Sequence, residues 1–202
     1  ALLVHYSTDY VFDGTKEGSY VEEDTPNPQS VYGLSKLLGE QAIVQSGAKH
    51  LIFRTSWVFG VHGNNFIKTI IRLAKERESL NVVADQHGAP TSAHLIAQVT
   101  TQVLAQYLQD AQFKAYGIYH LTASDQTTWH EYAQFIVEQT KLKQDIVLLK
   151  DNIKAIPSSA YPVPAKRPTN SCLNCGKIKK AFDVDLTHWQ IDVLSVIDAV
   201  CQ

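Results

Sequence analysis

Cysteine is scarce in this sequence, and the three that occur are Cys172, Cys175 and Cys201. An odd count without a secretory signal argues against a disulfide framework. Cys172 and Cys175 have the C-x-x-C spacing of some zinc and redox sites. A zinc site would need a second ligand pair at a recurring spacing, and a redox pair would lie near the start of a βαβ unit; the chain has neither. We therefore interpret the pair as ordinary thiols near a helix start and predict no metal site.

An excess of either charge is also missing, because 18 Lys and Arg residues face 20 Asp and Glu residues and the formal net charge is -2. This balance offers no electrostatic footprint for nucleic acid or an anionic membrane, so we predict neither as a partner. No apolar run is long enough to cross a bilayer, and the first residues lack the basic segment of a signal peptide. The expected compartment is therefore the cytoplasm.

What the sequence does contain is an alternation of short apolar stretches with helix-periodic ones. Strands are predicted at residues 2–8, 50–60, 80–85 and 117–123. Helices are predicted from residue 31 to a stop at Gly47, at 66–75, 92–108 and 129–139, and from about residue 188. Residues 151–175 are predicted to form a loop. Strands alternating with helices of this length predict an open α/β sheet with parallel strands.

Two of the predicted strands end in polar residues, the first at Thr8 and the second at the segment from Thr55 to Trp57. Ligands of open α/β sheets bind outside the carboxyl ends of the strands, so we expect a ligand site there. A large aromatic side chain beside a strand is usually part of the core. The polar position of Trp57 favours a functional role instead.

Tyr32 and Lys36 lie four residues apart on the helix that follows the first strand, and so share one helix face. An ammonium group near a phenol stabilises the phenolate, which makes a tyrosine a usable proton donor near neutral pH. The Thr8 hydroxyl could bond the same substrate oxygen. A Y-x-x-x-K pattern alone also suits any exposed helix. The catalytic reading is favoured by the context, a strand ending in Ser7-Thr8-Asp9 before the helix and one ending in RTSW after it.

At these residues the chain resembles the extended short-chain dehydrogenase/reductase superfamily and, within it, the dTDP-4-dehydrorhamnose reductases. The matching stretches are VHYSTDYVFDG, VYGLSKLLGE, HLIFRTSWVFG, GNNFIKTIIRLAKER, DQHGAPTSA, YHLTASDQTTW and IPSSAYPVPAKRPTNSCLN. The resemblance implies that Tyr32 is the catalytic acid, that Lys36 activates it and binds the nicotinamide ribose, and that Thr8 is the third catalytic residue. Tyr32 and Lys36 are thus the expected cofactor contacts.

The implied reaction is hydride transfer from NADPH or NADH to the C4 ketone of dTDP-4-dehydro-L-rhamnose, which gives dTDP-L-rhamnose. The expected contacts to the dTDP-sugar are Thr8, Asp9, Trp57, Asn65 and Arg167. Asn65 opens a helix, so capping is the alternative to sugar contact. Arg167 could be a solvated charge, but a cation in a proline-stiffened loop suits a pyrophosphate. We interpret His5, His120 and His130 as structural residues.

The resemblance also implies the domain organisation. A Rossmann-like doubly wound sheet would be formed by residues 1–60 and 91–124, and a smaller mixed α/β substrate domain by residues 61–90 and 125–202. The glycine-rich phosphate-binding turn of such a domain does not occur among the 202 residues. We therefore expect the amino-terminal half of the cofactor sheet to be absent from this chain. Alone, the chain should then bind NADPH poorly and turn over little.

Two further positions depart from the family pattern. The turn from Gly60 to Phe66 lacks a third glycine and is predicted to be a substrate-side loop. His94 stands where some family members are described as binding magnesium through a glutamate at a dimer contact. Magnesium prefers oxygen ligands, so we predict no magnesium-bridged dimer and leave a homodimer of another kind open.

Two other functions stay open on the same scaffold. A sugar-nucleotide epimerase or dehydratase would share this fold, but a dehydratase typically follows its Thr-Asp with a glutamate for water loss, whereas Tyr10 follows Thr8-Asp9 here. A non-catalytic regulatory or binding subunit is the second alternative. The presence of Thr8, Tyr32 and Lys36 argues against it.

Overall fold

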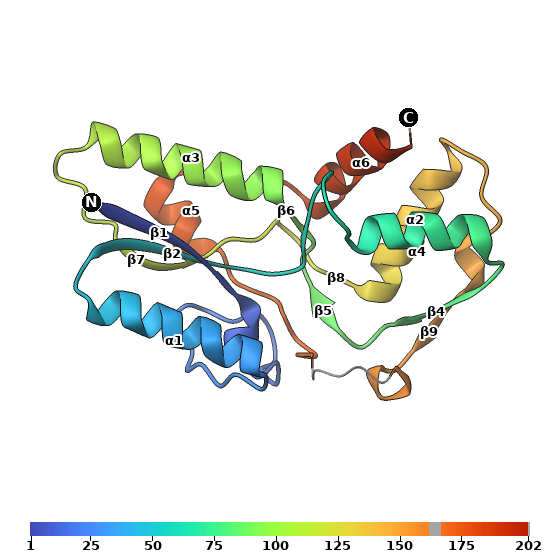
Figure 1. Ribbon diagram of the computed structural model, residues 1–202, viewed down its shortest axis with the longest axis horizontal. Coiled ribbons are helices and arrows are strands. Elements are labelled where there is room, and N and C mark those ends of the chain that lie inside the picture. The colour runs from blue at the N-terminus through green and yellow to red at the C-terminus, as the bar shows by residue number, and fades with distance from the viewer. Residues whose placement is uncertain (162–166, 202) are drawn as a thin grey trace.

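The computed structural model describes residues 1–161 and 167–201 as two lobes, one built on a parallel sheet and one largely helical (Figure 1). The sheet has the strand order β1-β2-β7, with β1 spanning Leu2–Thr8, β2 Lys49–Thr55 and β7 Gly117–His120. Helix α1 (Val31–Gln45) covers one face, and α3 (Ala93–Gln109) and α5 (Gly176–Phe182) lie on the other. All three strands run with their carboxyl ends toward the second lobe.

The second lobe packs α2 (Phe66–Glu76), α4 (Trp129–Lys141) and α6 (Trp189–Val200) together, with the parallel pair β4 (Leu80–Val83) and β9 (Ile153–Ile156) against α4. Two-residue strands join the lobes: β3 (Val58–Phe59) pairs with β6 (Thr91–Ser92), and β5 (His87–Gly88) with β8 (Thr127–Thr128). Short 3₁₀ turns occupy Asp9–Val11 (η1), Lys150–Asn152 (η2) and Ser158–Ala160 (η3).

The α/β fold with parallel strands predicted from the sequence is confirmed. The loop predicted at 151–175 is wrong in part, because it contains β9. Only Ile153 of β9 is buried, so the short stretch carries no alternating pattern, and its pairing with the distant β4 makes it a strand. Helix α5 was also missed as an element, although the sequence placed Cys172 and Cys175 near a helix start and Cys175 caps α5.

One hydrophobic core runs through both lobes and includes residues as far apart in sequence as Phe53, Leu95, Tyr132 and Ile197. A second, smaller cluster consists of Val11, Phe12, Tyr20 and Leu173. It holds the loop after β1 against the carboxyl-terminal segment, where Tyr20 and Leu173 form an isolated parallel bridge. The residues that follow β1 are therefore fixed by contacts made late in the chain. Among the described residues, no helix is long and apolar enough to span a membrane.

His120, at the end of β7, is fully buried beside Arg54. Burial, and then the nearby charge of Arg54, lowers the pKa of His120 from 6.5 to about 3. Between these two values the unfolded chain binds a proton that the folded chain does not. The free energy of unfolding should therefore fall as the pH is lowered from about 6.5 to about 3.

The His120→Leu variant should lose this pH dependence. The ratio of the unfolding constants of the two proteins should change about tenfold per pH unit across that window. Urea unfolding of both proteins at several pH values measures the difference, in which contributions from other titrating groups cancel. A constant difference between pH 4 and pH 7 would contradict a neutral buried imidazole.

Candidate active site

Thr8 ends β1 with a hydroxyl group that is buried and already engaged. Its Oγ1 donates to Asp9 Oδ1 at 3.0 Å and accepts from the Tyr10 backbone N–H at 3.2 Å. The second bond caps η1, because Thr8 is the N-cap residue of that turn. The structure thus brings the predicted site residues Thr8 and Asp9 together through their side chains.

Asp9 is a buried carboxyl group, 3% exposed. Burial raises its pKa from 3.8 to about 6, and hydrogen bonds from Ser171 and Thr8 oppose that shift. Although Ser171 lies beside the carboxyl group, Oδ2 has no well-directed hydrogen bond among the described residues. Burial thus makes the protonated form of Asp9 more accessible than that of an exposed carboxyl group.

The first turn of α1 packs directly on η1. Ser30 caps the helix by accepting from the Gly33 N–H at 3.1 Å. A Cβ on Gly33 would lie 2.2 Å from the Tyr10 carbonyl oxygen, so only glycine permits this approach. The approach sets the Tyr32 ring edge-on to the Tyr10 ring, with centroids 5.7 Å apart. Tyr32 is 55% exposed, so its phenol is open to a ligand.

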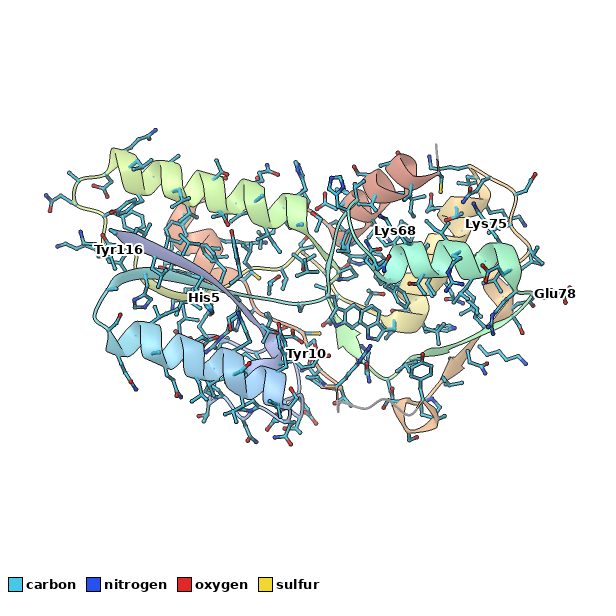
Figure 2. The ribbon with its side chains drawn as sticks, in the orientation of Figure 1. His5, Tyr10, Lys68, Lys75, Glu78 and Tyr116 are labelled. Carbon is cyan, nitrogen blue, oxygen red and sulfur yellow. The ribbon has the colours of Figure 1, made fainter. Side chains whose placement is uncertain are left out.

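Lys36 lies one turn further along α1, with its ammonium group against β1. It donates to the Tyr6 carbonyl oxygen at 2.5 Å and lies 3.3 Å from His5 Nε2. Figure 2 shows His5 between β1 and α1, and Tyr10 near the start of α1. Burial and then the Lys36 charge lower the pKa of His5, and the Lys36 ammonium, which can only donate, lies within hydrogen-bond distance of His5 Nε2. No hydrogen bond joins Tyr32 to Lys36 or Thr8 among the described side chains.

Trp57 has the left-handed backbone conformation, with a φ of 48°, in the short connection between β2 and β3. Its indole stacks on Trp129, with ring centroids 3.7 Å apart and planes 12° apart. Gly88 makes room for the ring, since a Cβ at that position would lie 2.5 Å from the Trp57 indole. A left-handed conformation in a bulky residue is strained and is often found at functional sites.

The Gly88→Ala variant should push the Trp57 ring off Trp129 and lower the free energy of unfolding by about 1–3 kcal/mol. Urea unfolding followed by tryptophan fluorescence measures both effects. Gly60→Ala is the matched control, because a Cβ on Gly60 meets only Ala93, at an ordinary 3.7 Å. Equal stability of the two variants would mean that the indole can move aside at little cost.

A cavity of about 780 Å³ lies beside this aromatic stack. Its walls come from α2, β4 and Trp129, and from the described residues Ser158, Ser159, Tyr161, Arg167 and Thr169. The charge of Arg167 also reaches Tyr10. Burial and the Asp9 charge raise the pKa of Tyr10, and the Arg167 charge lowers it. The predicted residue Arg167 therefore lines the cavity and also influences the charge of Tyr10. Residues 162–166 of the predicted stretch IPSSAYPVPAKRP lie outside the described residues.

Asn65 is used as a helix cap. Its Oδ1 accepts from the Lys68 N–H at 3.1 Å and its Nδ2 donates to the Gly60 carbonyl at 2.6 Å. It lines a second cavity, of about 540 Å³, together with the Gly60 loop, His94 and Asp192, and this cavity shares no lining residue with the larger one. The structure thus separates Asn65 from Arg167, and a sugar contact at Asn65 stays a prediction.

The cysteine pair and His94 offer no metal centre within the described ranges, where no group of three or more His, Cys, Asp and Glu residues is close enough to hold an ion. Cys172 and Cys175 carry free thiols. Burial raises the pKa of both, that of Cys172 to about 11, which is the opposite of what a reactive redox pair needs.

Sequence reasoning missed a buried ion pair behind the site. Arg54 of β2 donates to both carboxylate oxygens of Glu40 of α1, at 2.6 to 3.2 Å, and both side chains are 2% exposed. The guanidinium also lies over the Phe12 ring. The ion pair holds α1, the helix that carries Tyr32 and Lys36, against the sheet. A charge inside the apolar stretch LIFRT was the signal for it.

Comparison with known proteins gives consistent matches. A family model described as the RmlD substrate binding domain matches residues 1–201. The dTDP-4-dehydrorhamnose reductase of Salmonella typhimurium is 48% identical over 193 residues, which are 96% of this chain and 64% of that protein. The crystal structure of a dTDP-4-dehydrorhamnose reductase from Clostridium acetobutylicum superposes with a TM-score of 0.88 at 34% identity, covering 100% of this chain and 67% of that one.

A third match is the dTDP-4-dehydrorhamnose reductase of Bacillus anthracis, solved in complex with NADP. It has a TM-score of 0.85 at 32% identity, over 98% of this chain and 66% of that one. The chain thus spans about two thirds of the length of each of these three relatives, from 64% to 67%.

Proposed function

This chain belongs to the dTDP-4-dehydrorhamnose reductase family, and we propose that it carries the substrate side and the proton-donating residues of such a reductase. The reaction would reduce the C4 ketone of dTDP-4-dehydro-L-rhamnose to the alcohol of dTDP-L-rhamnose. The observation that carries the proposal is the packing of Tyr32 against Tyr10 just after β1, where Thr8 ends the strand, together with a cavity lined by Trp129 and by Arg167, whose charge reaches Tyr10.

In this proposal the cavity binds the dTDP-sugar. Its volume is in the range of pockets that hold ligands of this size. Arg167 would bond the pyrophosphate oxygens in bidentate fashion, and Trp129 with Trp57 would form the flat wall beside the sugar. The sugar C4 would then lie toward Tyr10 and Tyr32.

The ketone oxygen gains negative charge as C4 is reduced. Tyr32 would transfer its phenolic proton to that oxygen, and Thr8 would bond the same oxygen. The Lys36 ammonium, held by Tyr6 and His5, would stabilise the resulting phenolate. These are the same three residues that the sequence pattern nominates.

A nicotinamide cofactor, NADPH or NADH, would supply the hydride. The open face of Tyr32 and the ammonium of Lys36 suit the nicotinamide ribose end of such a molecule. A glycine-rich turn for its phosphates does not occur among the 202 residues. We keep the division into a cofactor domain, residues 1–60 and 91–124, and a substrate domain, residues 61–90 and 125–202, as part of this proposal. Helix α5 falls in the second range, although it packs on β7 and α3.

The proposal also includes a cytoplasmic location and the absence of a magnesium-bridged dimer. His94 lines the smaller cavity, where an imidazole would be a poor magnesium ligand. A dehydratase is the less favoured function, because Tyr10 follows Thr8-Asp9 at the position where a dehydratase typically has a glutamate, and its ring packs against Tyr32.

Titration with dTDP-L-rhamnose tests the substrate assignment in a calorimeter, on the 202-residue chain. Arg167→Ala should weaken binding at least about tenfold, which is the loss of one charge-assisted bond. Arg72→Ala is the control, because Arg72 is exposed on α2 and pairs only with Glu76 among the described residues. Turnover is measured as the loss of NADPH absorbance. The assay is run on the 202-residue chain and on a fusion protein, in which the chain is joined to the part of the Salmonella reductase that it does not match. No binding by the chain, with no turnover by the fusion, would overturn the proposal.

A further inference from the structure

The Thr8 hydroxyl has one proton, and the structure shows where it goes. With Asp9 ionised, Thr8 donates that proton to Asp9 Oδ1. Its oxygen also accepts from the Tyr10 N–H. A hydroxyl group has one donor and two lone pairs, so this arrangement leaves Thr8 able only to accept. A ketone oxygen is itself only an acceptor, and cannot bond to Thr8 in this state.

We propose that Asp9 is a positioning residue whose protonation turns the Thr8 hydroxyl from Asp9 toward the substrate ketone. In the protonated state the Asp9 carboxyl donates to Thr8 Oγ1, which still accepts from the Tyr10 N–H. The Thr8 proton is then free for the ketone oxygen. The inference rests on the proposed reductase function.

No bond to carbon changes in this step. Asp9 keeps its proton through the reaction, Thr8 keeps its own, and Tyr32 gives up the proton that ends on the new alcohol. The switch therefore adds no oxidant, reductant or leaving group to the proposed chemistry. It only determines whether the ketone oxygen accepts a hydrogen bond from Tyr32 alone or from both Tyr32 and Thr8.

The surroundings of Asp9 make the protonated form accessible. The carboxyl group is buried and Oδ2 has no well-directed partner among the described residues, so ionisation is poorly compensated. The groups facing it are Thr8 and Tyr10 from the end of β1, and Ser171 and Cys172 from the carboxyl-terminal segment. The pKa of Tyr10 and that of Cys172 are both raised, so each is neutral near pH 7. A bound sugar would displace water and raise the pKa of Asp9 further.

Binding of dTDP-4-dehydro-L-rhamnose to the fusion protein, measured by calorimetry between pH 5 and pH 8.5, tests the switch. The Kd should rise with pH, by up to about tenfold per pH unit between the pKa of Asp9 in the free protein and its higher pKa in the complex. The Kd of dTDP-L-rhamnose should stay nearly constant, because its C4 hydroxyl can donate as well as accept. In Asp9→Asn the amide can donate to Thr8 at every pH, so the ketone should bind without pH dependence. A flat wild-type profile, or an unchanged slope in Asp9→Asn, would overturn the inference while leaving the reductase proposal intact.

A second measurement needs no ligand. The Asp9 carboxyl carbon is titrated by ¹³C NMR in the 202-residue chain, with its signal assigned from the Asp9→Asn variant. Thr8→Val removes a donor to the ionised form and should raise the midpoint, and Ser171→Ala should raise it for the same reason. Ser7→Ala is the control, because Ser7 is buried on the same strand and has no hydrogen bond to Asp9 among the described residues. If Thr8→Val leaves the midpoint unchanged, the hydroxyl is not turned by Asp9. This result stands whether or not the chain binds a dTDP-sugar.

Discussion

Replacing Tyr32 with phenylalanine is expected to lower kcat of the fusion protein by about 10²–10⁴-fold, the usual contribution of a general acid. The phenylalanine ring can keep the edge-on contact with Tyr10, so the position of α1 should not change. Binding of dTDP-L-rhamnose should change little, because Arg167 and the tryptophan wall remain. Steady-state kinetics with NADPH, with calorimetry on the same protein, measure the two quantities separately.

Tyr107→Phe is the matched control. Tyr107 lies on α3 in the sheet lobe and packs against Phe113, so it neither lines the larger cavity nor takes part in the Tyr10–Tyr32 contact. It should leave both turnover and binding unchanged. Unchanged turnover in Tyr32→Phe would remove Tyr32 as the acid. If instead the wild-type chain binds the sugar but its fusion shows no turnover, a binding subunit is favoured.

Replacing Glu40 with alanine is expected to lower the free energy of unfolding by about 3–5 kcal/mol, because it leaves the buried Arg54 guanidinium without a counter-charge. One guanidinium nitrogen of Arg54, Nη1, already lacks a partner among the described residues, so the remaining site cannot compensate. Helix α1 should loosen with it, and kcat should fall together with stability. Urea unfolding of the 202-residue chain measures the loss.

Two comparisons isolate the buried charge as the cause. Glu76→Ala removes the carboxylate of the exposed Arg72–Glu76 pair and should cost no more than about 0.5 kcal/mol. The double variant Glu40→Met with Arg54→Met removes both charges and should recover most of the stability. If the double variant is as unstable as Glu40→Ala, packing volume, and not the uncompensated charge, explains the loss.

Local patterns in the sequence were enough to place much of the site. The Tyr32–Lys36 spacing follows from helix geometry, and the ends of β1 and β2 follow from apolar stretches that turn polar. Because these signals lie within a few neighbouring residues, the sequence predicted β1, β2, β4 and β7, most helices and the position of Thr8 at the end of β1. The resemblance in motifs then pointed to the family, and the whole-chain match bears it out.

Tertiary contacts decided the rest, because partners far apart in sequence leave no periodic signal. The pairing of β9 with β4, the stack of Trp57 on Trp129 and the salt bridge between Arg54 and Glu40 all join separate elements. The sequence named Thr8 and Asp9 as site residues. The direction of the Thr8 hydroxyl and the raised pKa of Asp9 depend on burial beneath the carboxyl-terminal segment, which only the folded chain creates.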